Sequence, residues 1–562
     1  MSSTQQPAPY RVAIIGGGPR GLWALEELRK QWQASTAHLP VAVTLIEPHA
    51  PGAGWVYRAG QSPVMRLNAP ASVVTSLTGG AFSDWLAAKP AIPGAQAGDP
   101  ASRVFVPRVV VGEFLHHCYQ QLLADLPPGM TIEHLPGLAT DVAISGDTID
   151  VSISDLPEES ESDHARSFDL GNHRTKSDVD GNPAGAPVVP ATVTVDEVLF
   201  ATGHVHAWEG ELSPALHPYF APGVDVIPAG ACVHMRGAAL TAIDVCLLLT
   251  EGRGGRFATS TREQWRYVRC GQEPKQIIPY SRSGRFMEVK PAPGSPLYQL
   301  DVAAAADLSD LLKSASTTEA IIDVLQQAAI AWLQAAGETI TSTHHAQVRA
   351  VLSGSDGSGD AVGDLRRSVQ VIRGTAAPSP QWAVGDAFRR LYPALVTARS
   401  YHYLPGFHRL CRTLERVAFG PPETTAGRLL ALIDEGIVTA PRTCALPNVK
   451  AALPETDWQH QYHRGDDEVW LVDATIAPPG IHDHSLAGRL RKLGLLTSDE
   501  NGLLAIGRNG YLTGSQRLAM VGRDVEGTVL GHDTLSRAMH PEIPRWAATV
   551  HDHVLAASQH ST

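Results

Sequence analysis

A glycine-rich turn between an apolar segment and a helix-like segment constrains this chain more than any other feature. The apolar run 12–15 stops at the turn, and leucines at a helical spacing follow it. A second apolar run, 41–46, ends on the acid Glu47. The turn carries three glycines in the pattern Gly-x-Gly-x-x-Gly, namely Gly16, Gly18 and Gly21. Strand, glycine turn, helix, strand and acid in this order predict a dinucleotide-binding βαβ unit.

Each glycine of this turn has its own physical role. Gly16 permits the tight turn, Gly18 lets the backbone approach a pyrophosphate, and Gly21 lets helix and strand pack closely. The start of the helix offers unpaired N–H groups and the positive end of its dipole to phosphates. Glu47 stands where a carboxylate accepts from ribose hydroxyls, which favours FAD or NAD over NADP. A steric glycine turn followed by a surface glutamate is the alternative.

Composition narrows the class of protein. The chain of 562 residues is long enough for more than one domain, and 43% hydrophobic with 18% charged residues is typical of a soluble enzyme. A net charge of −12 argues against a nucleic-acid-binding face, and no apolar run is long enough to predict a membrane span. The beginning of the chain does not resemble a signal peptide, so we expect a cytoplasmic protein. The cysteine and histidine spacings match no metal site, so we expect no metal.

The rest of the first domain is expected to be mostly sheet. Segments 131–152 and 191–200 have the apolar alternation of a β-meander, and the second leads into the tripeptide Ala-Thr-Gly that ends at Gly203. A glycine there lets the chain turn sharply beside a bound nucleotide. Residues 155–190 are acidic and polar without periodicity, so we expect a mobile insertion. A first dinucleotide-binding domain is therefore predicted over residues 8–225.

A second nucleotide-binding unit is expected over residues 226–300. An apolar run there precedes Gly237 and a helix-like segment, in the pattern Gly-x-Ala-x-x-Ala. Ala239 places a methyl group where the fingerprint has a glycine. A further apolar run is followed by Arg282, and an arginine at this strand end suits a 2′-phosphate. The pattern favours NADPH, with NADH as the other nucleotide; a solvated basic turn without a nucleotide is the alternative.

The C-terminal half is expected to be helical first and then to return to sheet. Segments 303–345 and 383–437 are helix-like, so a helical lid or substrate region is predicted over residues 301–450. Residues 451–562 are expected to return to the first domain, where a strand ending in Gly-x-Asp would bring Asp524 to the ribityl chain of a flavin. An ordinary Asx turn before a helix is the alternative for Asp524.

Five stretches together resemble a known family. They are residues 12–21, 52–57 with 67–70, 107–113 and 201–204. In these stretches the chain is similar to the FAD/NAD(P)-binding monooxygenases that include a bacterial urate hydroxylase and nitrosuccinate synthase, an aspartate N-monooxygenase. The resemblance implies an α/β fold with a Rossmann-like FAD domain, a second Rossmann-like NAD(P) unit and a helical insertion. It assigns FAD to the first glycine turn and to Glu47, and it places Asn68 in the flavin loop.

The resemblance also implies the activity. The expected protein is an FAD-dependent, NAD(P)H-driven monooxygenase that acts through a C4a-hydroperoxyflavin on a small polar substrate, with N-hydroxylation of an amino acid or amine as the expected reaction. A ring-carbon hydroxylase, and a reductase, dehydrogenase or oxidase that inserts no oxygen, are the alternatives; a non-enzymatic flavin-binding protein is a third. The expected partners are the substrate and molecular oxygen, without nucleic acid or membrane. For an acidic substrate, the candidate cations are Arg58, Arg66 and Arg108.

Overall fold

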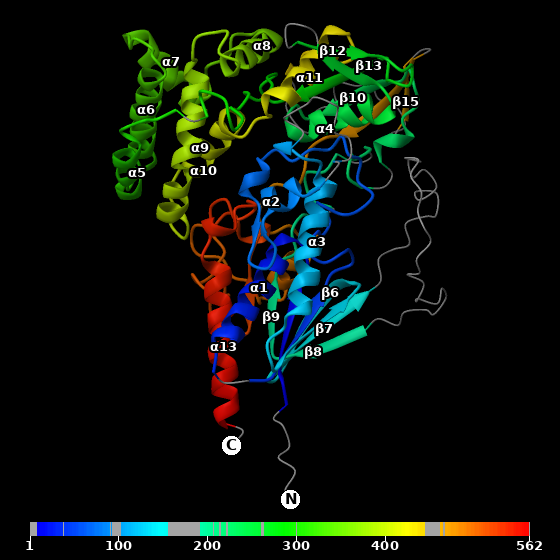
Figure 1. The fold of residues 1–562 in the computed structure, drawn as a ribbon, viewed down its shortest axis with the longest axis vertical. Coiled ribbons are helices and arrows are strands. Elements are labelled where there is room, and N and C mark those ends of the chain that lie inside the picture. The colour runs from blue at the N-terminus through cyan, green and yellow to red at the C-terminus, as the bar shows by residue number, and fades with distance from the viewer. Residues whose placement is uncertain are drawn as a thin grey trace, which may run out of the picture.

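Two five-stranded sheets, the first parallel and the second mixed, and a block of helices form the main body of the protein (Figure 1). The computed structural model describes residues 8–36, 39–89, 92, 103–154, 191–205, 207–212, 215–220, 223–259, 264–298, 300–443, 461–464 and 467–560. The expected insertion at 155–190 lies outside these residues. In Figure 1 the first sheet occupies the lower half, the second sheet the upper right and the helical block the upper left. This arrangement confirms the expected α/β fold with a helical insertion.

The first sheet has the strand order β17-β9-β1-β2-β5, and all its strands are parallel. Its strands are β1 (Tyr10–Ile15), β2 (Val41–Ile46), β5 (Met130–Leu135), β9 (Glu197–Phe200) and β17 (Leu518–Met520). Near-continuous apolar runs form the three central strands, because both faces of a parallel sheet are covered. Val12 and Ile14 pack on one side, and Ala13 and Ile15 pack on the other.

Helices cover one face of the first sheet and an antiparallel meander covers the other. The helices of the first face are α1 (Pro19–Ala34), α3 (Arg108–Ala124) and α13 (Glu542–His560). The meander consists of β6 (Leu138–Ser145), β7 (Thr148–Ser154) and β8 (Ala191–Val195), with α12 (Leu486–Lys492) against β6. The short helix α2 (Phe82–Ala87) packs against α3, and the hairpin of β3 (Thr75–Ser76) and β4 (Gly80–Ala81) lies next to α2.

The ends of the predicted meander belong to the first sheet instead. Strand β5 pairs in parallel with β2, and β9 lies between β1 and β17. Strand β5 is an edge strand with partly exposed residues, so its alternation looks like that of a meander strand. Strand β9 is wholly buried, which is the pattern of a central parallel strand.

The second sheet has the order β14-β13-β10-β16-β15. Its strands are β10 (Cys232–Arg236), β13 (Gln276–Ser281), β14 (Arg442–Thr443), β15 (Gln461–Arg464) and β16 (Asp467–Asp473), and α4 (Leu240–Leu248) follows β10. A hairpin of β11 (Arg256–Thr259) and β12 (Trp265–Val268) connects α4 to β13. Because β16 pairs in parallel with β10, the expectation that everything after residue 451 returns to the first domain is wrong for β15 and β16. That return begins after β16 and reaches the sheet at β17.

The helical block follows β13 in the chain and shares one hydrophobic core with the second sheet. The core joins Val233 and Met235 of β10 to Trp332 and Phe388 of the block. Its helices are α5 (Ala305–Ser314), α6 (Thr318–Ala335), α7 (Ser342–Ser353), α8 (Ala361–Ile372), α9 (Pro380–Arg399), α10 (Phe407–Ala418) and α11 (Glu423–Asp434). The block therefore packs as an extension of the second unit.

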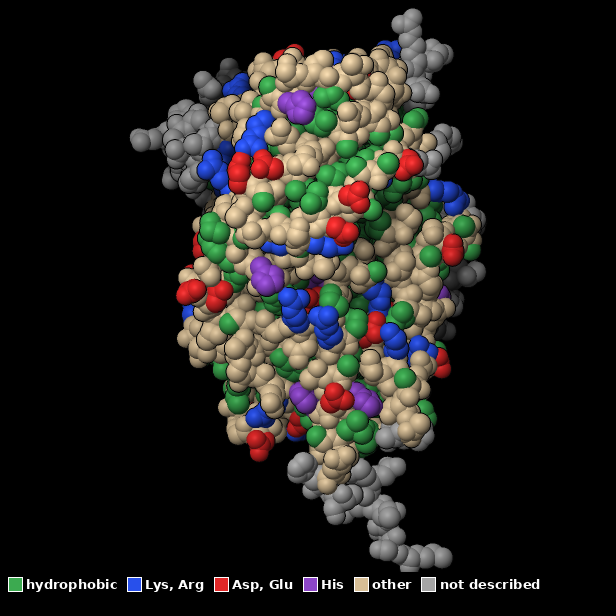
Figure 2. Space-filling model, turned by 90° about the vertical axis from the view of Figure 1, so that its left-hand side faces the viewer, with side chains coloured by type: hydrophobic (Ala, Val, Ile, Leu, Met, Phe, Trp, Pro, Cys, Tyr) green, Lys and Arg blue, Asp and Glu red, His purple; other side chains and the backbone are tan. Residues whose placement is uncertain are grey.

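The surface offers no large area of one charge on the face that Figure 2 displays. Lysine and arginine side chains alternate there with aspartate and glutamate. None of the helices in the described part of the chain is both long and apolar enough to span a membrane.

Candidate functional site

Two of the three glycines in the first turn are required by packing. Gly16 has φ +101°, and a Cβ there would lie 2.2 Å from the carbonyl oxygen of Ala201. A Cβ on Gly21 would lie 2.1 Å from the carbonyl oxygen of Gly16. Neither distance is tolerable for an L side chain, so these glycines let β1, β9 and α1 approach one another.

Gly18 has a different environment. Its φ of −69° is open to any residue, and the atom nearest to a Cβ at this position would be the Cα of Gly54, 3.9 Å away. Helix α1 begins at the next residue, Pro19, so the N–H groups of its first turn that have no partner within the helix lie close to Gly18. A pyrophosphate fits such a cradle, because it needs backbone donors and the absence of a Cβ.

Glu47 lies beneath the glycine turn and is 5% exposed. Its carboxylate accepts hydrogen bonds from the backbone N–H groups of Gly17, at 2.7 Å, and His49, at 2.9 Å. Burial raises the pKa of this carboxyl group, although both backbone donors favour the charged form. These contacts fix the carboxylate at the carboxyl end of β2, the place from which an acid reaches a ribose in this fold.

The same edge of the sheet also carries Gly203 and Asp524. Gly203 has φ +76° just after β9, and Asp524 follows β17 in a 3₁₀ turn. The hydroxyl of Thr202 donates to the Asp524 carboxylate, which links the two segments. Asp524 is 4% exposed, and burial raises its pKa to about 6. The structure thus brings together at one edge the residues Gly16, Gly18, Gly21, Glu47, Gly203 and Asp524.

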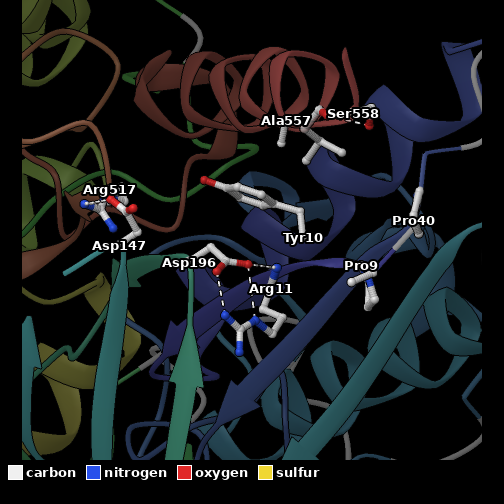
Figure 3. Close-up of a pocket in the computed structure, with 11 residues that line it drawn as sticks. Pro9, Tyr10, Arg11, Pro40, Asp147, Asp196, Arg517, Ala557 and Ser558 are labelled. Atoms are coloured by element: carbon white, nitrogen blue, oxygen red, sulfur yellow. Dashed lines mark hydrogen bonds and ion pairs between the residues drawn. The ribbon is translucent and has the colours of Figure 1, made fainter. Parts of the chain in front are cut away.

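The pocket drawn in Figure 3 lies elsewhere. This surface cavity of about 620 Å³ is lined by Tyr10 and Arg11 at the opposite, amino end of β1. Its charged groups are paired, Arg11 with Asp196 at 2.7 Å and Arg517 with Asp147 at 3.7 Å. The cavity is therefore separate from the glycine turn.

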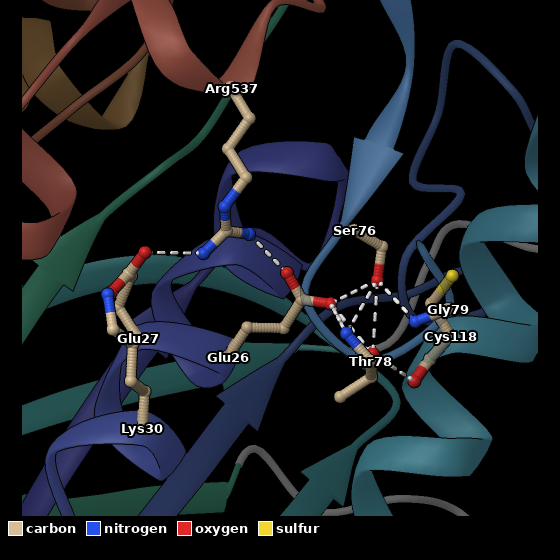
Figure 4. Close-up of polar contacts among 8 residues, drawn as sticks. All are labelled: Glu26, Glu27, Lys30, Ser76, Thr78, Gly79, Cys118 and Arg537. Carbon is tan, nitrogen blue, oxygen red and sulfur yellow. Dashed lines mark hydrogen bonds and ion pairs between the residues drawn. The ribbon is translucent and has the colours of Figure 1, made fainter. Parts of the chain in front are cut away.

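A buried polar network holds helix α1 in place (Figure 4). The guanidinium of Arg537 contacts both Glu26 and Glu27 of the helix. Glu26 also accepts hydrogen bonds from the hydroxyls of Ser76 and Thr78. The network connects α1 to the β3–β4 hairpin and to the segment before α13, so it fixes the helix whose N-terminus faces the cradle.

The second unit has the same strand–turn–helix arrangement, but its turn leaves less open space before the helix. Gly237 has φ +121° directly after β10, and a Cβ there would lie 2.8 Å from the carbonyl oxygen of Ala474. Ala239 is the N-cap of α4, so its methyl group lies at the start of the helix. Arg282 follows β13 and is exposed. Its neighbour Arg285 is instead paired with Asp356, at 2.7 Å.

Sequence reasoning missed the ion pair at the end of the second sheet. Arg236 of β10 and Asp473 of β16 are each 3% exposed at the side chain and are joined by two hydrogen bonds. Asp473 also accepts from the backbone N–H of Leu212, and Arg236 donates to Thr475. The partners lie 237 residues apart, so no local pattern reveals them.

A largely buried ion pair joins the first unit to the second. Arg108 at the start of α3 pairs with Asp244 in α4 at 2.6 Å, and the hydroxyl of Tyr219 donates to the same carboxylate oxygen. The other two candidate cations are also engaged: Arg58 donates to the carbonyls of Trp55 and Tyr219, and Arg66 to that of Phe105. These contacts give all three predicted arginines a structural role.

Asn68 lies at the junction of three parts of the molecule. Its side-chain amide donates to the carbonyl of Phe419 in the helical block at 3.0 Å. Its own backbone carbonyl accepts from Lys290, which follows the second unit's strand β13 in the chain. No local sequence pattern points to Lys290. Within the described residues, no cluster of His, Cys, Asp or Glu side chains is arranged to hold a metal ion.

Comparison with known proteins finds partial matches to an FAD-NAD(P)-binding family model and to nitrosuccinate-forming enzymes. A family model described as FAD-NAD(P)-binding matches residues 13–164, which contain the first glycine turn and Glu47. The nitrosuccinate-forming L-aspartate N-monooxygenase of Streptomyces davaonensis is 26% identical over 307 residues, 49% of this chain and 45% of that protein. The nitrosuccinic acid synthase of Aspergillus oryzae is 28% identical over 296 residues, 49% of this chain and 41% of that protein. These matches confirm the resemblance, and the chain spans less than half the length of these relatives.

The solved structures that the chain matches are more distant in sequence. The FAD-bound cadaverine monooxygenase of Erwinia amylovora is 10% identical with a TM-score of 0.42, over 98% of this chain and 95% of that one. The lysine monooxygenase of Nocardia farcinica is 12% identical with a TM-score of 0.40, over 96% and 98%.

Proposed function

We propose that the protein is an FAD-dependent, NAD(P)H-driven monooxygenase that oxygenates the nitrogen of a small amine or amino acid. The observation that carries the proposal is the pair of glycine turns, each between a central parallel strand and a helix, at the carboxyl edges of two sheets in one chain. The matches to nitrosuccinate-forming monooxygenases support the N-oxygenating activity.

The first turn suits FAD. Gly18 and the start of α1 would hold the pyrophosphate, and Glu47 would accept from the ribose hydroxyls. Asp524, buried at the same edge, would face the ribityl chain. Flavin, when bound, supplies the redox chemistry and the activation of oxygen, while the protein positions it and excludes water.

The second turn suits NADPH. The start of α4 would receive the pyrophosphate, and the exposed Arg282 would contact a 2′-phosphate. The bridge of Arg108, Asp244 and Tyr219 holds the two turns in one arrangement. The helical block, which packs on the second unit, would enclose the substrate.

Oxygen-isotope incorporation tests the proposal most directly. The purified protein is incubated with FAD, NADPH and ¹⁸O₂, and with L-aspartate, L-lysine or cadaverine, and the products are analysed by mass spectrometry. Incorporation of ¹⁸O into an N-hydroxylated or more oxidised nitrogen product is expected. NADPH oxidation without incorporation into any product would contradict the monooxygenase and favour an oxidoreductase that inserts no oxygen.

A further inference from the structure

Lys290 is a buried cation that no carboxylate neutralises within the described residues. The residue is 8% exposed, and its ammonium donates to the backbone carbonyl of Asn68. Its charged neighbour is a second cation, Arg389, which is itself paired with Asp386. Burial and the nearby guanidinium hold the pKa of Lys290 well below its usual value. An ammonium in such a place is costly unless it serves another group.

Asn68, the residue that Lys290 contacts, has one side-chain atom without a hydrogen-bond partner among the described residues. The Nδ2 of Asn68 donates to the carbonyl of Phe419 at 3.0 Å, which fixes the orientation of the amide. The Oδ1 of the same amide is buried and has no hydrogen-bond partner in the described part of the chain. A buried carbonyl oxygen without a donor is rare in folded proteins. An amide oxygen carries no hydrogen and can only accept, so this atom requires a donor.

Three parts of the molecule hold this amide in place. The loop of Asn68 belongs to the first unit, since the neighbouring Leu67 donates its N–H to Val106 beside α3. Lys290 is held by its own backbone N–H, which donates to Pro421. Phe419 packs edge-to-face against Phe388 and Tyr392 of the helical block. The free oxygen therefore has a rigid support.

We propose that Asn68 Oδ1 accepts a hydrogen bond from an N–H group of the bound ligand, and that Lys290 is the positioning residue that holds Asn68 for it. The inference rests on the proposed function, which places a flavin and an amine substrate in this protein. Either can supply the N–H, the flavin from its ring imide and the substrate from its amine. Lys290 acts through the Asn68 backbone, so both residues serve the same contact.

A double-mutant cycle of Lys290→Met and Asn68→Ala tests this. K290M keeps the apolar stem and removes the ammonium, and N68A keeps the backbone carbonyl that Lys290 contacts. The measurements are the Kd for FAD by fluorescence titration, and kcat and KM for whichever of L-aspartate, L-lysine and cadaverine the wild type oxygenates. Each single variant is expected to raise either the Kd for FAD or the KM for the substrate about tenfold. The double variant is expected to raise it no further, because both residues act on one contact.

The affected quantity identifies the ligand. A higher Kd for FAD assigns the N–H to the flavin, and an unchanged Kd with a higher KM and a nearly constant kcat assigns it to the substrate. K290R keeps a cationic donor, so it is expected to lie closer to the wild type than K290M does. It also tests the contact if the K290M variant fails to fold. The matched control K313M changes an exposed lysine on α5 and is expected to change neither quantity.

Two results would overturn the inference, and only the second would also overturn the proposed function. A wild-type protein that binds flavin, with K290M and N68A variants equal to it or with effects that simply add, overturns this inference alone. A wild-type protein that binds no flavin overturns the proposed function, and the inference with it.

Discussion

The two units that carry the glycine turns share a strand–turn–helix arrangement but differ in the residues at two equivalent places. The turn of the first unit leaves open space at Gly18, whereas the second has the methyl group of Ala239 at the start of its helix. The second strand ends on a buried acid, Glu47, in the first unit and is followed by an exposed cation, Arg282, in the second. Opposite charges at this place favour different riboses, unphosphorylated in one unit and phosphorylated in the other.

The units also differ in how their sheets are held together. In the first unit Arg11 and Asp196 form an ion pair with side chains 40% and 22% exposed, whereas Arg236 and Asp473 in the second are buried. Asp473→Ala would leave a buried guanidinium unpaired and is expected to lower the free energy of unfolding by about 3–5 kcal/mol. Asp196→Ala, the matched control, is expected to cost no more than about 1 kcal/mol. Urea unfolding measures the free energy of unfolding of the two variants. Equal losses of stability would contradict the difference between the two ion pairs.

The open space at Gly18 gives the next largest effect. Gly18→Val keeps an allowed backbone conformation but fills the cradle, so the Kd for FAD should rise about 100-fold or more with little change in thermal stability. Gly357→Val, in an exposed loop and also without positive φ, serves as the control. A yellow, fully loaded G18V protein would show that the first turn does not hold the pyrophosphate.

The exposed arginine of the second unit can be tested by comparing nucleotides. Arg282→Ala should raise the KM for NADPH about tenfold and leave the KM for NADH nearly unchanged, because only NADPH carries the 2′-phosphate. Arg266→Ala, another exposed arginine in the same unit, provides the control. Equal changes for the two nucleotides would remove the proposed difference between the units.

A pH-dependent effect is expected from the acids that follow β17 in the first unit. Burial, with Asp533 nearby, raises the pKa of Glu526 to about 8. Since the folded-state pKa lies above the unfolded one, this group favours folding at low pH, and the contribution is lost as the pH rises toward about 8. The melting temperature of Glu526→Gln should therefore fall less than that of the wild type between pH 5 and 8.5. Glu133→Gln, at an exposed position, is the control, and parallel curves for E526Q and the wild type would contradict the shift.

The sequence predicted the features that depend on neighbouring residues. The turn around Gly16, the acid at the end of β2 and the helical block follow from local glycine pattern and periodicity. The place of β16 could not be predicted, because it pairs with β10 across the whole helical block. Lys290 gave no signal either, since its role depends on Asn68, 222 residues away in the chain.

Anaerobic reduction by nicotinamide nucleotides tests the central claim, that the two units bind different nucleotides and exchange electrons. The FAD-loaded protein is mixed without oxygen or substrate, first with NADPH and then, in a separate sample, with NADH. The account predicts loss of the flavin absorbance at about 450 nm with NADPH, and slower or weaker loss with NADH. A yellow protein that keeps this absorbance with both nucleotides would contradict it, because the second unit would then deliver no electrons to the first.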